Sequence, residues 1–237
     1  MPPIHRFERL PSTQDELHRL AAAGAPAGTV VVAVEQEAGR GSRGRRWASP
    51  PGGLWLSFLC RPRQTIGVEV LSLRTGLATA EALAELGGLP PVALKWPNDL
   101  IVSDRKVGGI LGEARWQGDS LAWVAIGLGL NVQNTLPTAV RTPPGRLADW
   151  RPALEPDHVL PPLLARLAPL AEAGAGLSSA ELDAFAGRDW LAGRELAAPV
   201  QGRAAGIAPD GALLVTLPDG RTVAVSSGSV LLAGEAA

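Results

Sequence analysis

Cysteine and histidine are scarce in this sequence, and their scarcity excludes several kinds of site. Cys60 is the only cysteine in 237 residues, so an internal disulfide is impossible. A lone thiol inside the apolar run LWLSFLC is more often part of a core than a nucleophile. The three histidines lack the spacing of metal ligands, and we assign them no role. A Ser-His-Asp pattern, a Walker P-loop and a Cys-x-x-Cys pair are also missing, so triad hydrolysis, P-loop chemistry and a zinc site are unsupported.

Excess charge and long apolar runs are missing too. The 22 Lys and Arg residues nearly balance the 23 Asp and Glu residues, so no overall field would draw the chain to DNA or to an anionic membrane. No stretch approaches 18 uninterrupted apolar residues, and the N-terminus MPPIHRFERL has prolines and charges where a signal peptide needs an apolar segment. We therefore expect a protein of the reducing cytoplasm, with no membrane association.

The pattern of apolar residues predicts an α+β fold. Ser12-Thr13 begins a helix that ends near Gly24, and alanines and leucines at helical spacing predict a second helix over 68–86. The β-branched run from Thr29 and the run from Leu54 predict two strands with a long loop between them. The segments VALKW, DLIVS, KVGGILGEARW and SLAWVAIGLGLNV, separated by turn residues, predict successive strands of one antiparallel sheet.

The last third of the chain changes character. Residues 133–152 carry four prolines and predict a surface loop, and two further helices are expected over 156–173 and 178–191. Beyond them Asp210-Gly211 and Asp219-Gly220 punctuate short β-rich runs about ten residues apart, the rhythm of a small barrel. We expect a main domain over 1–191 and a small β-domain over 192–237.

The segment GRGSRGRRW, Gly39 to Trp47, is called the Gly-Arg loop below. Its three glycines let the backbone approach a ligand closely, and its four guanidinium groups suit phosphate or carboxylate oxygens. The glycines also satisfy G-x-G-x-x-G, but the following SPPGG cannot begin the helix that a dinucleotide fingerprint requires. The alternatives are a solvated basic loop and a local nucleic-acid patch.

The segment KWPNDL places a cation, an indole, a rigid turn, an amide and a carboxylate within a few positions. Pro97 stops the strand, so Asn98 and Asp99 are expected at a turn and outside a ladder. There Asn98 could read a purine edge, and Asp99 could accept from a substrate or hold a lysine. The alternative is an ordinary turn beside an exposed lysine.

Two further segments combine glycine with strand alternation. In DRKVGGILGE, Lys106 precedes paired glycines, which weaken a strand unless a ligand must approach the backbone; the alternative is a hairpin turn with an exposed lysine. In AIGLGLNV, Gly127, Gly129 and Asn131 share one face by the period of two. A flat apolar ring could lie on that bare face, and tight packing against a helix is the ordinary alternative.

Taken together and in this order, Ser12-Thr13, EQEAGRGSRGRRW, GGLWLSF, KWPNDLIV, DRKVGGILGE and GLGLNV resemble the catalytic domain of the biotin protein ligase family. The C-terminal GALLVTLPDG resembles that family's SH3-like barrel. The resemblance implies a class II synthetase-like catalytic domain with a mixed, largely antiparallel sheet and flanking helices, followed by the barrel. It implies an enzyme that joins biotin to ATP as biotinyl-5'-AMP and passes biotin to a lysine of a biotin carboxyl carrier protein.

The resemblance also implies site residues. The catalytic cations are Lys106, Arg40 and Lys95, acting with Mg²⁺, because attack of a carboxylate on a phosphate brings two anions together. The biotin-binding residues are Ser12, Thr13, Gln14, Gln36, Gly39, Arg40, Gly41, Ser42, Lys106, Gly109, Leu111, Gly127 and Gly129. The ATP-binding residues are Arg43, Arg45, Trp47, Asn98 and Asn131. The Gly-Arg loop would close over the intermediate and shield it from water.

The chain departs from the family pattern at three positions. Gln14 stands where Asn is usual, Ser42 where an Arg often lies, and Ser229 where a Glu is found. The chain also starts almost at once with the catalytic domain, without a helix-turn-helix, so we expect no DNA binding. A lipoate or octanoate protein ligase of the same fold and a non-enzymatic basic-loop binding module are the rivals. A homodimer paired through a sheet edge is a further possibility.

Overall fold

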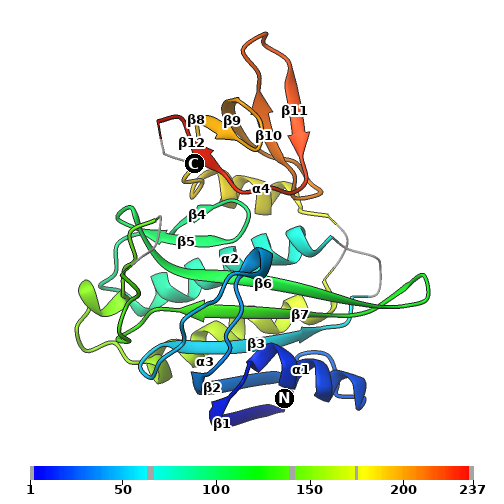
Figure 1. The fold of residues 1–237 in the computed structure, drawn as a ribbon, viewed down its shortest axis with the longest axis vertical. Coiled ribbons are helices and arrows are strands. Elements are labelled where there is room, and N and C mark those ends of the chain that lie inside the picture. Colours follow the sequence, from blue (N-terminus) through cyan, green and yellow to red (C-terminus); the bar gives the residue numbers. More distant parts are fainter. Residues whose placement is uncertain (1–2, 63–66, 139–141, 174–175, 235–237) are drawn as a thin grey trace.

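The computed structural model describes residues 3–62, 67–138, 142–173 and 176–234. Within these ranges a large sheet has seven strands (Figure 1). From one edge to the other they are β1 (Ile4–Leu10), β2 (Val30–Gln36), β3 (Leu54–Cys60), β7 (Ser120–Leu130), β6 (Arg105–Gln117), β5 (Asp99–Val102) and β4 (Ala93–Lys95).

The large sheet is mixed and largely antiparallel, as the sequence predicts. β1 and β2 run parallel, and every other neighbouring pair is antiparallel. The expected run of successive antiparallel strands, β4 to β7, is confirmed. β1 was not predicted, because at the edge of the sheet it is mostly exposed and only three of its seven residues, IHRFERL, are apolar.

Helices cover both faces of this sheet (Figure 1). They are α1 (Thr13–Ala22), α2 (Val68–Leu86) and α3 (Pro156–Leu167), and α4 (Ser179–Ala186) packs against α2. Side chains from alternate strand positions, such as Leu56 and Ile126, join α2 and α3 in the main core. The opposite positions, such as Leu59 and Ala125, pack with Leu17 of α1 in a smaller cluster. α1 covers only part of its face, which leaves room there for a site.

The two later helices are shorter than predicted. The helix expected over 156–173 ends at Leu167 and continues as a 3-10 helix over Ala168–Glu172. Pro169 lies in its first turn and has no N–H to extend the α-helical ladder. The helix expected over 178–191 ends at Ala186, where Gly187 follows. Residues 142–152 and the described part of 133–141 form a loop with one 3-10 turn, Leu147–Asp149, although Asn134 and Leu147 are buried.

A second, antiparallel sheet follows α4. Its strands, in spatial order, are β11 (Thr222–Val225), β10 (Leu213–Thr216), β9 (Gly202–Ile207), β8 (Glu195–Ala198) and β12 (Leu231–Leu232). The Trp96 indole N–H donates to the carbonyl of Gly211 in the β9–β10 turn at 2.9 Å, which joins this sheet to the KWPNDL segment. The domain boundary at 191/192 stays a prediction.

Cys60 is buried at the end of β3, as expected for a core thiol. Burial raises the pKa of its thiol to about 12. Because the thiolate is the reactive form, we expect a water-soluble maleimide to leave the native protein unmodified and to label it only after denaturation. Stoichiometric labelling of the native protein, measured by mass, would contradict this placement.

No helix in the described ranges is both long enough and apolar enough to cross a membrane.

Candidate active site

A cavity of about 810 Å³ lies on the α1 face of the large sheet, beside that helix and beneath the Gly-Arg loop. The side chains that line it come from α1, β6, β7, the Gly-Arg loop and the KWPNDL turn. The predicted residues that line it are Ser12, Thr13, Gln14, Gln36, Arg40, Gly41, Ser42, Arg43, Arg45, Trp47, Lys95, Asn98, Lys106, Gly109, Leu111, Gly127, Gly129 and Asn131. Gly39 is the exception; a side chain there would clash with the Trp47 carbonyl at 2.5 Å, so it shapes the loop.

One end of the cavity is a polar pocket at the start of α1. Gln36 Oε1 accepts from the Thr13 backbone N–H at 2.8 Å and from its hydroxyl at 3.0 Å. The Thr13 hydroxyl also lies 2.8 Å from that of Ser57. The Gln14 amide nitrogen donates to the carbonyls of Leu111 and Ala125, at 3.1 and 3.3 Å, which orients its oxygen. The pocket is therefore held in shape by the protein alone.

Three buried polar atoms at this cavity are unpartnered. Within the described part of the chain, Ser12 Oγ, Gln14 Oε1 and Trp47 Nε1 have no hydrogen-bond partner. A buried polar group left unsatisfied costs about 1–3 kcal/mol. All three residues line the cavity, so a ligand with both donors and acceptors would recover these interactions.

The bare glycine face of β6 and β7 is present as predicted, and the protein's own side chains lie against it. Gly109 and Gly129 are paired across the two strands, and a Cβ on either would meet the Trp47 indole, at 3.1 and 2.5 Å. A Cβ on Gly127 would lie 3.1 Å from Gln14. The flat ring on these glycines is thus the indole of Trp47, which forms part of the cavity wall.

Lys106 lies at the other end of the cavity, beside Trp47. Its ammonium group forms a short ion pair with Asp99 and lies 5.2 Å from the centre of the Trp47 ring. Asp99 thus holds a lysine, one of the two roles considered for it. The carboxylate holds the ammonium group at the cavity wall.

The KWPNDL turn differs in one detail from its prediction. Asp99 lies in the ladder, paired with Lys95 on β4 and with Gly109 on β6, because β5 begins directly at this residue. Asn98 is at the turn, and its amide nitrogen donates to the Ile110 carbonyl at 2.7 Å. Lys95 is buried, with its ammonium 4.8 Å from the centre of the Trp190 ring.

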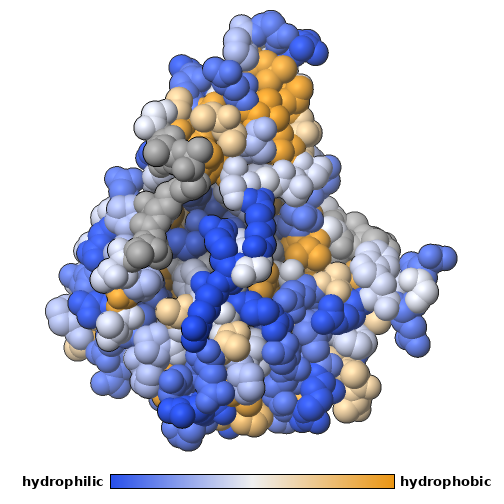
Figure 2. Space-filling model, viewed as in Figure 1, coloured by the Kyte–Doolittle hydropathy of each residue, from blue (hydrophilic) through white to orange (hydrophobic). Residues whose placement is uncertain are grey.

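The Gly-Arg loop folds into a small hairpin over the cavity. Arg40 and Arg46 pair at its base, Ser42–Gly44 form a 3-10 turn, and Arg43 has a φ of 60° at the tip. The Arg45 guanidinium donates to the Ser42 hydroxyl at 2.8 Å, so the small residue leaves room for a neighbouring arginine. Figure 2 shows hydrophilic side chains gathered over the middle of this face, where Figure 1 shows the loop crossing β6 and β7.

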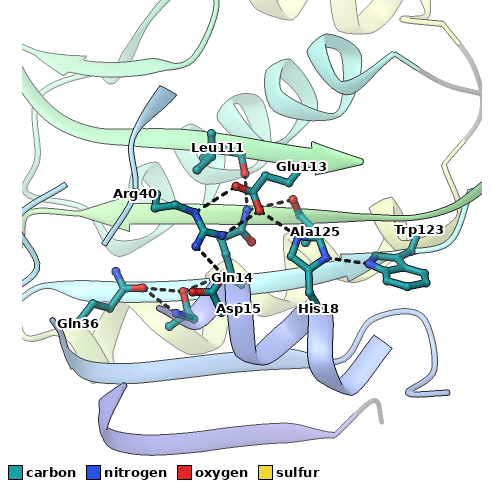
Figure 3. A network of polar contacts seen from close by, with 11 residues as sticks. Gln14, Asp15, His18, Gln36, Arg40, Leu111, Glu113, Trp123 and Ala125 are labelled. Carbon is teal, nitrogen blue, oxygen red and sulfur yellow. Dashed lines mark hydrogen bonds and ion pairs between the residues drawn. The ribbon is translucent and has the colours of Figure 1, made fainter. Parts of the chain in front are cut away.

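The Arg40 guanidinium lies apart from Lys106. It donates to both oxygens of Glu113, at 3.2 and 3.0 Å, and to Asp15 at 2.5 Å (Figure 3). Glu113 also contacts His18 Nε2 at 2.9 Å, and the Trp123 indole N–H donates to His18 Nδ1 at 2.9 Å. The sequence indicated none of these partners. His18 lies one helical turn after Gln14 on the buried side of α1, which is the only available signal.

Glu113 couples this cluster to pH. The hydrogen bond from His18 and the ion pair with Arg40 hold the pKa of Glu113 at about 2, below its ordinary 4.5, although burial opposes them. A lowered folded-state pKa stabilises the protein above 4.5, and this contribution is lost as the pH falls toward 2. We expect Glu113→Gln to be less stable than the wild type at neutral pH. Denaturant unfolding should show the difference shrinking below pH 4.5; a difference that persists unchanged in acid would contradict it.

The second sheet also reaches the cavity. Gly228, Ser229 and Val230, which lie between β11 and β12, line it together with Lys95 and Pro97. Among these residues the sequence drew attention only to Ser229, as a departure from the family pattern. Their contact depends on how the second sheet docks, which no local motif encodes.

The chain that forms this cavity is similar to known proteins over nearly its whole length. The biotin/lipoate A/B protein ligase family matches residues 6–131, and the biotin protein ligase C-terminal domain matches residues 193–232. The biotin--[acetyl-CoA-carboxylase] ligase of Paracoccus denitrificans is 33% identical over 91% of this chain and 95% of its own. The bifunctional ligase/repressor BirA of Bacillus subtilis is 40% identical over 52% of this chain, but the match spans only 38% of that protein.

The solved structure of a biotin protein ligase from Aquifex aeolicus, in complex with biotin and ATP, has the same fold. It superposes with a TM-score of 0.82 at 28% identity, over 98% of this chain and 99% of the other. The matched segment 6–131 contains most of β1, all of β2 to β7, the Gly-Arg loop and every predicted site residue. The chain therefore belongs to the biotin/lipoate A/B protein ligase family.

Proposed function

We propose that the protein is a biotin protein ligase, which forms biotinyl-5'-AMP from biotin and ATP and transfers biotin to a lysine of a biotin carboxyl carrier protein. The observation that carries this proposal is the unpartnered oxygen of Gln14, buried beside the unpartnered hydroxyl of Ser12. The ureido ring of biotin has two N–H donors and one carbonyl. It matches a pocket that offers both an acceptor and a hydroxyl.

The same observation weighs against the rival within the family. Octanoate and the dithiolane ring of lipoate have no N–H group, so either would leave the Gln14 oxygen buried and unsatisfied. A site with buried polar groups rejects a ligand that cannot pair with them, by factors up to about 10⁴–10⁵. The well-formed cavity, for its part, favours an enzyme over a basic-loop binding module.

The proposed reaction needs cations and no covalent enzyme intermediate. A carboxylate oxygen of biotin attacks the α-phosphorus of ATP, a P–O bond forms, and the bond to the bridging oxygen of pyrophosphate breaks. Negative charge grows between two anions at this step, and Lys106, fixed by Asp99, stands where it can stabilise that charge. The acceptor amine then attacks the biotinyl carbonyl, AMP leaves, and the amine loses a proton.

Mg²⁺ fits this proposal as the partner of the ATP phosphates. Among the described residues no group of three His, Cys, Asp or Glu side chains is arranged to hold a metal. Mg²⁺ is commonly bound through substrate phosphates with one or two carboxylates, so the nucleotide itself would supply most of the ligands. When bound, the ion would neutralise the phosphate oxygens during attack.

Exchange of labelled pyrophosphate into ATP tests this function. We expect exchange with biotin and none with octanoate or lipoate. Exchange with lipoate or octanoate but not with biotin would reverse the assignment, and no exchange with any acid would favour a binding module. Incubation with an isolated carrier domain and its Lys→Arg variant then tests the acceptor, because only the lysine form should gain the mass of biotin.

A further inference from the structure

The contacts of Arg40 differ from those expected of a catalytic cation. Its side chain is about two-thirds buried, and its guanidinium donates two hydrogen bonds to one carboxylate, that of Glu113. Such a forked pair is among the stronger polar contacts in proteins. The additional contact with Asp15 is more exposed, with 58% of that side chain accessible, and contributes less. Glu113 is therefore the main partner of Arg40.

Glu113 is itself oriented by His18, which is in turn hydrogen-bonded to Trp123 (Figure 3). The Trp123 indole N–H can only donate, so His18 Nδ1 accepts and carries no proton. The proton of neutral His18 is then on Nε2, which donates to Glu113 at 2.9 Å. His18 is buried and Trp123 is partly buried, and Arg61 lies 5.5 Å from the centre of the Trp123 ring. The carboxylate is thus held by a chain of two partly or fully shielded side chains.

The place of Glu113 in the sheet keeps Arg40 away from the proposed reaction centre. Glu113 and Gly109 share a face of β6 four residues apart, and a strand rises about 3.3 Å per residue, which separates them by roughly 13 Å. Lys106 lies against Gly109, its Cε 3.6 Å from a Cβ built there. The two cations therefore stand at opposite ends of the β6 face.

The backbone of Arg40 lies in the base of the Gly-Arg hairpin, whereas its guanidinium reaches Glu113 on β6. Arg40 pairs with Arg46 at the base of the Gly-Arg hairpin, between the bonds Trp47 N–H to Gly39 O at 2.8 Å and Gly41 N–H to Arg45 O at 2.7 Å. On the following strand of this base, Trp47 lies on Gly109 and Gly129. Holding the Arg40 side chain therefore holds the hairpin over the cavity.

We propose that the Arg40 guanidinium anchors the Gly-Arg loop, and that Glu113, oriented by His18, is the positioning residue that holds this anchor. Arg40 then acts through the loop and does not contact the reacting phosphate. The role in retaining the adenylate rests on the proposed function, whereas the anchoring itself does not. This assignment replaces the catalytic role that the sequence suggested for Arg40.

A double-mutant cycle tests the anchor. The variants are Arg40→Met, which keeps the apolar stem, Glu113→Gln, which keeps the shape, and the two combined. Trypsin cleavage after Arg43 or Arg45 in the ligand-free protein, followed by mass spectrometry, reports opening of the loop. We expect Arg40→Met to speed this cleavage about tenfold and Glu113→Gln to speed it by a smaller factor, because Asp15 still pairs with Arg40 there. The double variant should cleave no faster than Arg40→Met, because the Glu113 contact is already lost in that variant. Glu16→Gln, which breaks an exposed pair with Arg19 on the same helix, is the matched control and should cleave like the wild type.

The same variants separate anchoring from direct catalysis. If Arg40 is an anchor, both variants should slow adenylate formation and speed adenylate release, each in proportion to its effect on loop cleavage. Glu113→Gln should therefore show part of the effect of Arg40→Met, because Asp15 still pairs with Arg40 in it. A loss of about 100-fold in adenylate formation for Arg40→Met alone, with Glu113→Gln near the wild type, would overturn the proposal. Unchanged cleavage in both single variants would also overturn it. If the wild type forms no adenylate, the proposed function fails, and the cleavage rates still decide the anchor.

Discussion

Replacing Lys106 by alanine should slow biotin-dependent pyrophosphate exchange about 100-fold or more, because one preorganised cation at developing charge is worth roughly 3 kcal/mol. The proposed function gives Lys106 the central role, and in the structure Asp99 pairs with its ammonium group beside the Trp47 ring. Binding of biotin alone, measured by calorimetry, should weaken far less than the rate. This split follows because the charge on phosphorus grows only in the transition state.

One lysine variant and one arginine variant serve as comparisons for Lys106→Ala. Lys95→Ala should slow exchange less, because Lys95 packs against Trp190 and sits at the KWPNDL turn. Arg105 is the cation next to Lys106 in the sequence; it pairs with Asp149 and lies outside the cavity lining. The Arg105→Ala variant should therefore exchange pyrophosphate at the wild-type rate. Near-wild-type exchange by the Lys106 variant would show that the catalytic cation has been placed wrongly.

Adding a methyl group at one or the other glycine of this face should raise the KM for one substrate more than that for the other. Gly129→Ala puts a Cβ 2.5 Å from the Trp47 indole nitrogen, so the ring must leave its seat. Overpacking of this kind costs about 1–3 kcal/mol, and we expect the KM for ATP to rise roughly tenfold or more. Gly127→Ala meets Gln14 at 3.1 Å, a milder conflict, and should raise the KM for biotin a few-fold.

A third glycine provides the control for these variants. Gly187 follows α4 with a φ of −68°, and a Cβ there would meet nothing closer than 3.7 Å. Gly187→Ala should therefore keep both KM values and the melting temperature. If Gly129→Ala raised the KM for biotin and spared that for ATP, the assignment of Trp47 to the nucleotide end would be wrong.

Much of the fold could be predicted because local patterns determine it. α2 occupies the predicted residues 68–86, since its helical spacing is unbroken and it is buried along most of its length. The alternation of Gly127, Gly129 and Asn131 placed the bare face correctly, because a strand's period of two is rigid. β1 escaped notice because an exposed edge strand carries few apolar residues.

The candidate site was harder to predict in its pairings. The sequence brought Arg40 and Lys106 to one cavity, but which carboxylate each cation meets depends on sheet register. Register places Asp99 beside Gly109, and Glu113 lies four residues further along β6, where it pairs with Ala125 of β7. His18 and Trp123 join the cluster through tertiary contacts between α1 and β7, and no spacing within either segment announces them.

The most direct test of the account follows oxygen atoms through one turnover. Biotin labelled with heavy oxygen in its carboxylate is incubated with the protein, ATP, Mg²⁺ and a carrier domain, and the AMP is analysed by mass spectrometry. Because a carboxylate oxygen bonds to the α-phosphorus and stays there when the lysine amine displaces AMP, the account predicts one heavy oxygen in each AMP formed. Unlabelled AMP, or release of ADP and phosphate in its place, would contradict the acyl adenylate and with it the function proposed for this cavity.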